Sequence, residues 1–243
     1  MQHPLRQARP SDPFLRLRVD DDHVGAYAID GDHVAFVRTG RRSGETWVTG
    51  LGDDAPRILA LIDELRPAGF DGVTVYDHVF AHLPDDLRGP EPGHWSLWEL
   101  VGDLPDIAHS TVRLLPDDPR IDPLLAHSAS AYIHAGHPGV IQWRGIVDGD
   151  RLVAVGAWTA STGGAVHLVS ICTDPAERGR GLGRAITAGL ADQALRSGAT
   201  GVNLEMYAAN AAAARAYGSV GFVEQGRYMS AHRDGPSSPD AEA

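Results

Sequence analysis

The sequence contains one cysteine and no lysine, and acidic residues outnumber basic ones. Because Cys172 is alone, no disulfide can form within the chain, which is typical of a protein of the reducing cytosol. The 21 basic residues are all arginines, a bias that we attribute to overall composition. Against 32 acidic residues they leave a formal net charge of −11, which argues against a nucleic-acid partner and against an anionic membrane surface.

Long apolar segments are also missing. No run of apolar residues approaches the ~20 residues that a membrane-spanning helix requires. The first residues, Met1 to Pro13, are polar and lack the apolar core of a signal peptide, so we expect a cytoplasmic protein. The 12 histidines are scattered without the spacing of paired metal ligands, and we expect no metal. Residues 233–243 are rich in Pro, Ser and acidic residues, which predicts a disordered tail.

Two short sequence patterns occur twice and in the same order. An Asp-Gly pair between β-forming runs, which is typical of a two-residue hairpin turn, occurs at Asp30-Gly31 and again at Asp148-Gly149. Farther along each half, a glycine closes a helix-like segment before another strand, at Gly69 and at Gly198. The repeated order indicates a duplication.

The duplication predicts an α/β fold in which each copy is a hairpin, a strand, a helix and a strand. The two helices are expected at residues 56–67 and 184–197, and in the second one apolar residues follow the helical repeat. We divide the chain into two domains, residues 1–105 and residues 106–232, followed by the tail.

The strongest local signal is a loop rich in glycine and arginine. It follows a strand predicted at residues 166–172 and opens the second helix with Arg178-Gly179-Arg180-Gly181-Leu182-Gly183-Arg184. Glycines let the backbone approach an anion closely, and a helix start presents unpaired N–H groups with a partial positive charge of ~0.5 e. Three arginines add forked hydrogen-bond donors suited to phosphate. The loop therefore predicts a site for a pyrophosphate.

Spacing alone leaves open which pyrophosphate compound binds. A dinucleotide fold has the pattern G-x-G-x-x-G with an acidic residue about 20 positions on. Here the glycines follow G-x-G-x-G, and Glu205 does lie about 20 positions after the loop. A dinucleotide-dependent oxidoreductase is therefore one reading of these residues.

Two motifs together resemble the GNAT superfamily of N-acetyltransferases. Arg178-x-x-Gly181-x-Gly183 resembles the acetyl-CoA pyrophosphate loop of that family, Gln/Arg-x-x-Gly-x-Gly/Ala, which lies between a strand and a helix. The segment from Asn210 to Phe222 resembles the family's pattern Asn-x-x-Ala-x-x-x-Tyr-x-x-x-Gly-Phe. The resemblance covers residues 110–229. It implies acetyl-CoA as a co-substrate, no metal, and tandem GNAT-like domains, each with a mostly antiparallel central sheet of splayed strands flanked by helices.

The resemblance also implies which residues contact the cofactor. The backbone of the strand before the loop would pair with the pantetheine arm, backbone amides of the loop would hold the pyrophosphate, and the Asn210 segment would contact the rest. Carried onto this sequence, the cofactor-binding residues are Ile171, Cys172, Thr173, Arg178, Gly179, Arg180, Gly181, Leu182, Gly183, Arg184, Asn210 and Tyr217.

Two residues are predicted to carry catalysis. An ammonium must lose a proton before it can attack a thioester, and a carboxylate can take that proton. Strand alternation puts Glu205 on the face opposite Leu204 and Met206, and some GNAT enzymes have their proposed base at this position. Tyr217 matches the family's tyrosine and would protonate the departing thiolate. His167 remains open as an alternative base.

The first copy lacks the features of a phosphate site. Aligning Gly69 with Gly198 places Asp53 and Asp54 opposite Leu182 and Gly183, and two carboxylates at a helix start repel a diphosphate. We therefore expect a degenerate GNAT-like first domain and one cofactor per chain.

The predicted function is transfer of an acetyl group from acetyl-CoA to a primary amine by direct attack in a ternary complex. The alternative is a non-catalytic acyl-CoA-binding or sensor module. The sequence leaves open whether the amine acceptor is a small molecule or a peptide, whether the donor carries acetyl or a longer acyl group, and whether the chain is a monomer or a homodimer.

Overall fold

The computed structural model describes residues 2–39, 44–106 and 110–233, and the chain forms two compact units. The first unit comprises the chain up to Leu97, Tyr207–Ala209 and the chain from Gln225 onward, and the second comprises Trp98–Met206 and Asn210–Glu224. The C-terminal strand thus leaves the second unit and ends in the first. The domain division at residues 105 and 106 stays a prediction, and the predicted tail beyond Arg233 lies outside the described residues.

In the first unit the strands lie in the order β1-β2-β3-β4-β11-β5. Their bounds are β1 Val24–Asp30, β2 His33–Thr39, β3 Thr46–Leu51, β4 Gly72–Tyr76, β5 Gly93–Leu100 and β11 Phe222–His232. The helices are α1 Pro4–Ala8, α2 Pro13–Arg18, α3 Ala55–Glu64, α4 Asp77–Phe80 and α5 Asp85–Arg88.

Alternation along β2 separates the two faces of this sheet. Ala35 and Val37 pack in one cluster with Ile58 of α3, whereas Val34 and Phe36 pack in another with residues of α1 and α2. Helices therefore cover both faces, as the apolar residues at successive positions of this strand require.

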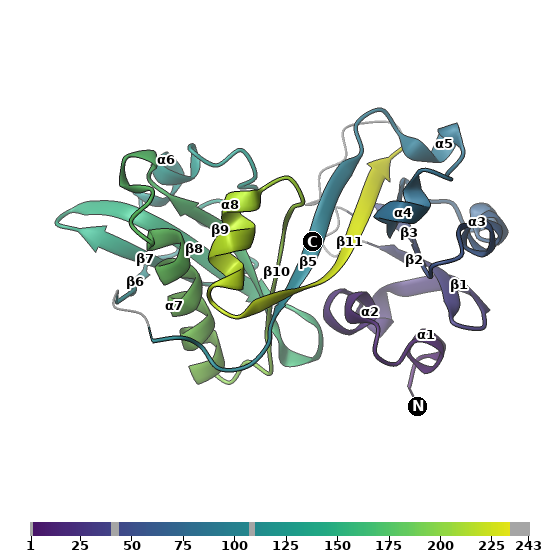
Figure 1. The fold of residues 1–243 in the computed structure, drawn as a ribbon, viewed down its shortest axis with the longest axis horizontal. Coiled ribbons are helices and arrows are strands. Elements are labelled where there is room, and N and C mark those ends of the chain that lie inside the picture. The colour runs from purple at the N-terminus through teal and green to yellow at the C-terminus, as the bar shows by residue number, and fades with distance from the viewer. Residues whose placement is uncertain (1, 40–43, 107–109, 234–243) are drawn as a thin grey trace. The chain divides into compact units, whose positions relative to one another are not determined.

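In the second unit the strands lie in the order β10-β9-β8-β7-β6. Their bounds are β6 Val112–Leu114, β7 Val140–Asp148, β8 Arg151–Ala160, β9 Val166–Thr173 and β10 Val202–Tyr207. The helices are α6 Ile121–Leu125, α7 Leu182–Arg196 and α8 Ala211–Gly218. Figure 1 shows α7 and α8 together on one face of this sheet, where they share a hydrophobic cluster with Leu168 and Leu204. α6 packs in a second cluster with Trp143, Val169 and Cys172.

The predicted order of elements is present in both units. Each has an antiparallel hairpin, a third strand antiparallel to it, a helix, and a fourth strand parallel to the third. Both hairpins turn through two residues whose first is a glycine with positive φ, 65° at Gly31 and 59° at Gly149. A type II′ turn requires a glycine at that position. The mixed α/β fold is confirmed. Both hairpins are present, but their turns are Gly31-Asp32 and Gly149-Asp150, one residue later than the predicted Asp-Gly pairs.

The helix bounds differ slightly from those expected. α3 ends at Glu64, and Arg66–Ala68 continue as a short 3-10 turn, because proline at position 67 has no N–H for the α-helical ladder. α7 begins two residues earlier than expected, at Leu182, because Gly181 has the left-handed conformation and ends the loop. Within the described ranges, no helix is long and apolar enough to cross a lipid bilayer.

Candidate acyl-transfer site

The candidate site begins with an irregularity in β9. Between the pairs Val155–Cys172 and Ala157–Val169, one residue of β8 lies opposite two residues of β9, which is a β-bulge. Ser170 lies in this bulge at φ 52° and is the sole non-glycine residue with positive φ in the described part of the chain. Its hydroxyl donates a hydrogen bond to the Ile133 carbonyl at 2.7 Å, which holds the strained backbone in place.

Beyond the bulge, β9 and β10 separate. Their parallel register runs from Val166–Val202 to Leu168–Leu204 and ends there, although β9 continues to Thr173 and β10 to Tyr207. The edge of β9 that faces β10 is therefore available to another extended chain at Ile171 and Thr173. In the first unit, four of the five residues of β4 pair with β3, so the same two strands stay together.

The start of α7 lies beside the C-terminal end of β9, since a Cβ at Gly183 would be 3.7 Å from Thr173 Oγ1. Gly179 and Gly181 have φ of 79° and 76°, and a Cβ at either would contact nothing within 4 Å, so these glycines serve the backbone conformation rather than packing. Gly181 is the N-cap and supplies no side chain, which leaves the first N–H groups of a 15-residue helix without a side-chain cap. Such a helix start attracts anions.

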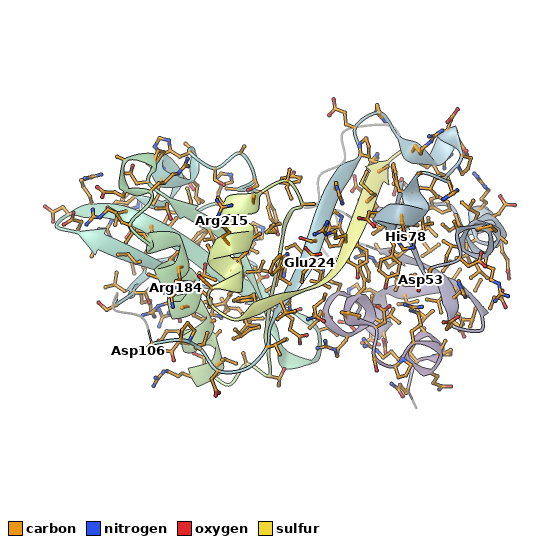
Figure 2. The ribbon with its side chains drawn as sticks, in the orientation of Figure 1. Asp53, His78, Asp106, Arg184, Arg215 and Glu224 are labelled. Atoms are coloured by element: carbon orange, nitrogen blue, oxygen red, sulfur yellow. The ribbon has the colours of Figure 1, made fainter. Side chains whose placement is uncertain are left out.

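The three arginines of the loop differ in their surroundings. Arg180 donates from Nη1 to Oε2 of Glu177, a buried carboxylate. Arg178 and Arg184 are exposed, and neither has an ion-pair partner among the residues that the structure describes. Figure 2 shows Arg184 at the start of α7. The loop therefore presents two guanidinium groups and several backbone N–H groups to solvent.

The corresponding helix start in the first unit is capped by a side chain. Asp54 is the N-cap of α3 and accepts from the Arg57 amide at 3.2 Å, while its own amide donates to His33 Nε2 at 3.2 Å. Asp53 adds a further carboxylate, 3.7 Å from His78 (Figure 2). Asp54 and Gly181 occupy equivalent positions, because each is the N-cap of its helix. The alignment of Asp54 with Gly183 that was inferred from the sequence is therefore wrong. Three residues join β3 to α3, and eight join β9 to α7.

Glu205 is the first residue of β10 beyond the last pair with β9. Asn203 and Glu205 point to the face opposite Leu204, which packs against α7, so the predicted alternation is confirmed. His167 lies on the same face as Asn203, and its Nδ1 is 2.6 Å from Asn203 Oδ1, while the Asn203 amide donates to Ser161 Oγ at 3.1 Å. The buried His167 ring is thus held by a structural contact, whereas Glu205 is partly exposed where the strands part.

Tyr217 lies on α8 in the hydrophobic cluster that contains Leu182 and Leu204. Its residue exposure is 9%, and burial raises the pKa of the phenol to about 12. The hydroxyl therefore remains protonated at neutral pH. Asn210 begins α8 and accepts from the Ala213 amide at 3.1 Å through its side-chain oxygen, so its NH₂ group remains as a donor for a ligand.

Cys172 is part of the core rather than a nucleophile. Its side chain is buried and donates to the Leu124 carbonyl at 3.3 Å. Burial raises the pKa of the thiol, and the nearby Arg178 guanidinium only partly opposes this effect. Its backbone pairs with Val155 of β8, so the unpaired edge is formed by its neighbours Ile171 and Thr173.

Within residues 2–39, 44–106 and 110–233, no group of three or more His, Cys, Asp or Glu side chains is arranged to hold a metal ion.

The bulge at Ser170 and the partner of Arg180 were not predicted from the sequence. Glu177 lies three positions before Arg180, and that spacing of opposite charges was a readable signal. The bulge had no such signal, because a serine in a β-forming run gives no indication of positive φ.

Residues 108–222 match the model of the acetyltransferase (GNAT) family. Over this segment the chain is similar to GNAT acetyltransferases. The match supports acyl transfer as the activity of this segment, and acetyl-CoA is the usual co-substrate of that family. Among curated proteins, none matches the sequence.

Several solved structures share the fold. A GNAT-family acetyltransferase from Novosphingobium aromaticivorans is 20% identical, with a TM-score of 0.54 over 80% of this chain and 86% of that chain. A GCN5-related N-acetyltransferase from Kribbella flavida is 17% identical, with a TM-score of 0.52 over 84% and 88%. A third, from Sphaerobacter thermophilus, is 17% identical, with a TM-score of 0.53 over 85% and 78%. At these identities the likeness concerns the fold alone, and its extent includes residues of the first unit.

Proposed function

We propose that the second unit transfers an acetyl group from acetyl-CoA to a primary amine by direct attack in a ternary complex. The observation that carries this proposal is the separation of β9 and β10 beside the uncapped start of α7. An unpaired strand edge and an anion-binding helix start lie at one end of the same sheet. A ligand that joins an extended amide-containing arm to a diphosphate fits both, and acetyl-CoA has that chemistry.

The residues present have the donors and acceptors that such a ligand needs. The backbone of Ile171 and Thr173 would pair with the amides of the arm as an added strand. The N–H groups from Gly179 to Arg184, with the Arg178 and Arg184 guanidinium groups, would hold the diphosphate. The NH₂ group of Asn210 would donate to the arm.

Glu205 and Tyr217 are the proposed catalytic groups. Glu205 would take a proton from the acceptor ammonium, directly or through a water, so that the amine nitrogen can attack the thioester carbonyl. When the carbon–sulfur bond breaks, the CoA sulfur needs a proton, and the Tyr217 hydroxyl would supply it. The second proton that the nitrogen loses after the attack would then pass through solvent and restore the phenol. Burial raises the pKa of Tyr217 to about 12, so the phenol carries its proton throughout the neutral range.

We propose that the first unit binds no cofactor and supports or shapes the active one. Its strands β3 and β4 stay paired, and Asp54 and His33 occupy the start of α3. We also propose a small-molecule or peptide amine as acceptor, a cytoplasmic location and a monomer or homodimer. The buried reduced thiol of Cys172 is consistent with that location.

The proposed activity is tested by release of free thiol from acetyl-CoA. The purified chain is mixed with acetyl-CoA and a panel of amines that includes polyamines, aminoglycosides, amino acids and peptides with free N-termini. We expect amine-dependent thiol release with at least one acceptor, and mass spectrometry should show the acetylated product. Tight acetyl-CoA binding without turnover on any amine would favour a non-catalytic binding module instead.

Tyr217→Phe should retain the affinity for acetyl-CoA and lower kcat by ~10²-fold or more, the usual scale for loss of a general acid. Because the pKa of Tyr217 is about 12, its ionisation should cause no fall in wild-type kcat up to pH 9. Steady-state rates from pH 6 to pH 9 check both points. Tyr27→Phe, at an exposed tyrosine of the first unit, is the matched control and should behave as wild type. A Tyr217→Phe variant with wild-type kcat would exclude the tyrosine as the acid.

Glu205→Gln should lower kcat/KM most at low pH, because there the acceptor amine is protonated and needs a base. The substitution keeps the shape of the side chain and removes its charge. Glu64→Gln, at an exposed position of α3, should leave the pH profile unchanged. If Glu205→Gln gives the wild-type profile from pH 6 to pH 9 with the true acceptor, another group is the base, and His167 becomes the next candidate.

A further inference from the structure

Four charged side chains form a ladder beside the phosphate loop. Arg151 donates from Nη2 to Asp174 Oδ2 at 2.9 Å and from Nη1 to Glu177 Oε1 at 3.3 Å. Arg180 donates from Nη1 to the second oxygen of Glu177. Each carboxylate oxygen of Glu177 thus meets a different arginine, one from β8 and one from the loop.

The ladder joins the loop to a rigid hairpin. Arg151 is the first residue of β8, directly after the turn at Gly149. Asp174 follows β9, its amide donates to the Val153 carbonyl at 3.0 Å, and its carboxylate accepts from the Ala176 amide at 2.9 Å. The Ala176 amide and the Arg151 guanidinium hold the pKa of Asp174 below its usual range. Backbone and side-chain contacts therefore fix the first part of the loop against β8.

Glu177 is the central member of the ladder. It is buried, with a residue exposure of 9%, and a buried carboxylate is stable only when it is paired. Arg151 and Arg180 satisfy both of its oxygens. A pairing that holds Glu177 inside also fixes the backbone of Arg178 and Gly179, which follow it directly.

We infer that Glu177 is a positioning residue of the phosphate loop. Its ion pairs with Arg151 and Arg180, which we call the clamp, hold the loop in place. The Arg180 guanidinium therefore binds Glu177 and is not a ligand of the diphosphate. Arg178 and Arg184 then supply the side-chain contacts to the ligand, and Arg180 contributes only its backbone N–H. A loop that is fixed before binding loses less conformational entropy when the ligand arrives. This inference rests on the proposed function, because it assigns roles within the same acetyl-CoA site.

A double-mutant cycle measured with CoA by calorimetry tests the clamp. The variants are Glu177→Gln, Arg180→Ala and Arg178→Ala, together with Glu177→Gln combined with each alanine. Glu177→Gln should weaken CoA binding about five- to tenfold, and Arg180→Ala should then add less than about twofold, because coupled residues are not additive. Arg178→Ala should cost about tenfold or more in either background, as a direct charge-assisted contact.

A further variant, Arg151→Ala, tests the clamp from outside the loop. This side chain is exposed at the hairpin, so the variant should fold, and it should weaken CoA binding to the same extent as Glu177→Gln. Arg196→Ala is the matched control, because Arg196 pairs with Asp192 on an exposed turn at the far end of α7. It should bind CoA as wild type does. Thermal melting of every variant verifies folding.

Each other outcome contradicts the inference in a distinguishable way. If Arg180→Ala costs the same with and without Glu177→Gln, or if Glu177→Gln tightens binding, Arg180 is a ligand that Glu177 restrains, and the clamp is wrong. Unchanged affinity in folded Arg151→Ala also refutes it. A folded wild-type chain that does not bind CoA overturns the proposed function itself, and the assignment within its site with it.

Discussion

The parting of β9 and β10 after the Leu168–Leu204 pair is the constraint on which the candidate site depends. While two parallel strands stay paired, their facing backbone groups satisfy one another and have no capacity for a ligand. Beyond Leu168 these groups need other partners. The bulge at Ser170 accompanies the change, since it adds a residue to β9 and turns the strand away from its earlier direction. Three features then lie at the end of the sheet. They are an open strand edge, the partly exposed Glu205, and a helix whose N-cap is a glycine.

The two units show how one topology can either present or close such a site. Both place a helix directly after the third strand, so both have a helix start with unpaired N–H groups. In the second unit, Gly181 leaves these groups to solvent, and the loop is long enough to carry arginines. In the first, Asp54 caps the helix, and the Gly52 backbone lies against His33, so a methyl group there would be 2.5 Å from the imidazole ring. A few residues between strand and helix therefore decide whether an anion can bind.

Much of this arrangement was readable from the sequence, and the limits of that reading have physical causes. Both hairpins lie where the Asp-Gly pairs predicted them, but each turn begins one residue later, at the glycine, which readily adopts the positive φ of the first turn residue. The face of Glu205 followed from strand alternation. The bulge at Ser170 and the contact of Arg151 with Glu177 could not be predicted, because they arise when segments far apart in the chain pack together. The alignment of Asp54 with Gly183 failed for a related reason, since the extra residues of the second copy lie between β9 and α7.

Amide hydrogen exchange with and without acetyl-CoA tests whether the opened strands and the uncapped helix start form the site. If they do, the ligand should slow exchange at residues 171–173 and 179–184 and leave residues 51–54 of the first unit unchanged. All three segments are measured in the same sample, so residues 51–54 are an internal control. Equal protection of all three segments, protection confined to residues 51–54, or no protection at residues 171–173 and 179–184 would show that the site lies elsewhere.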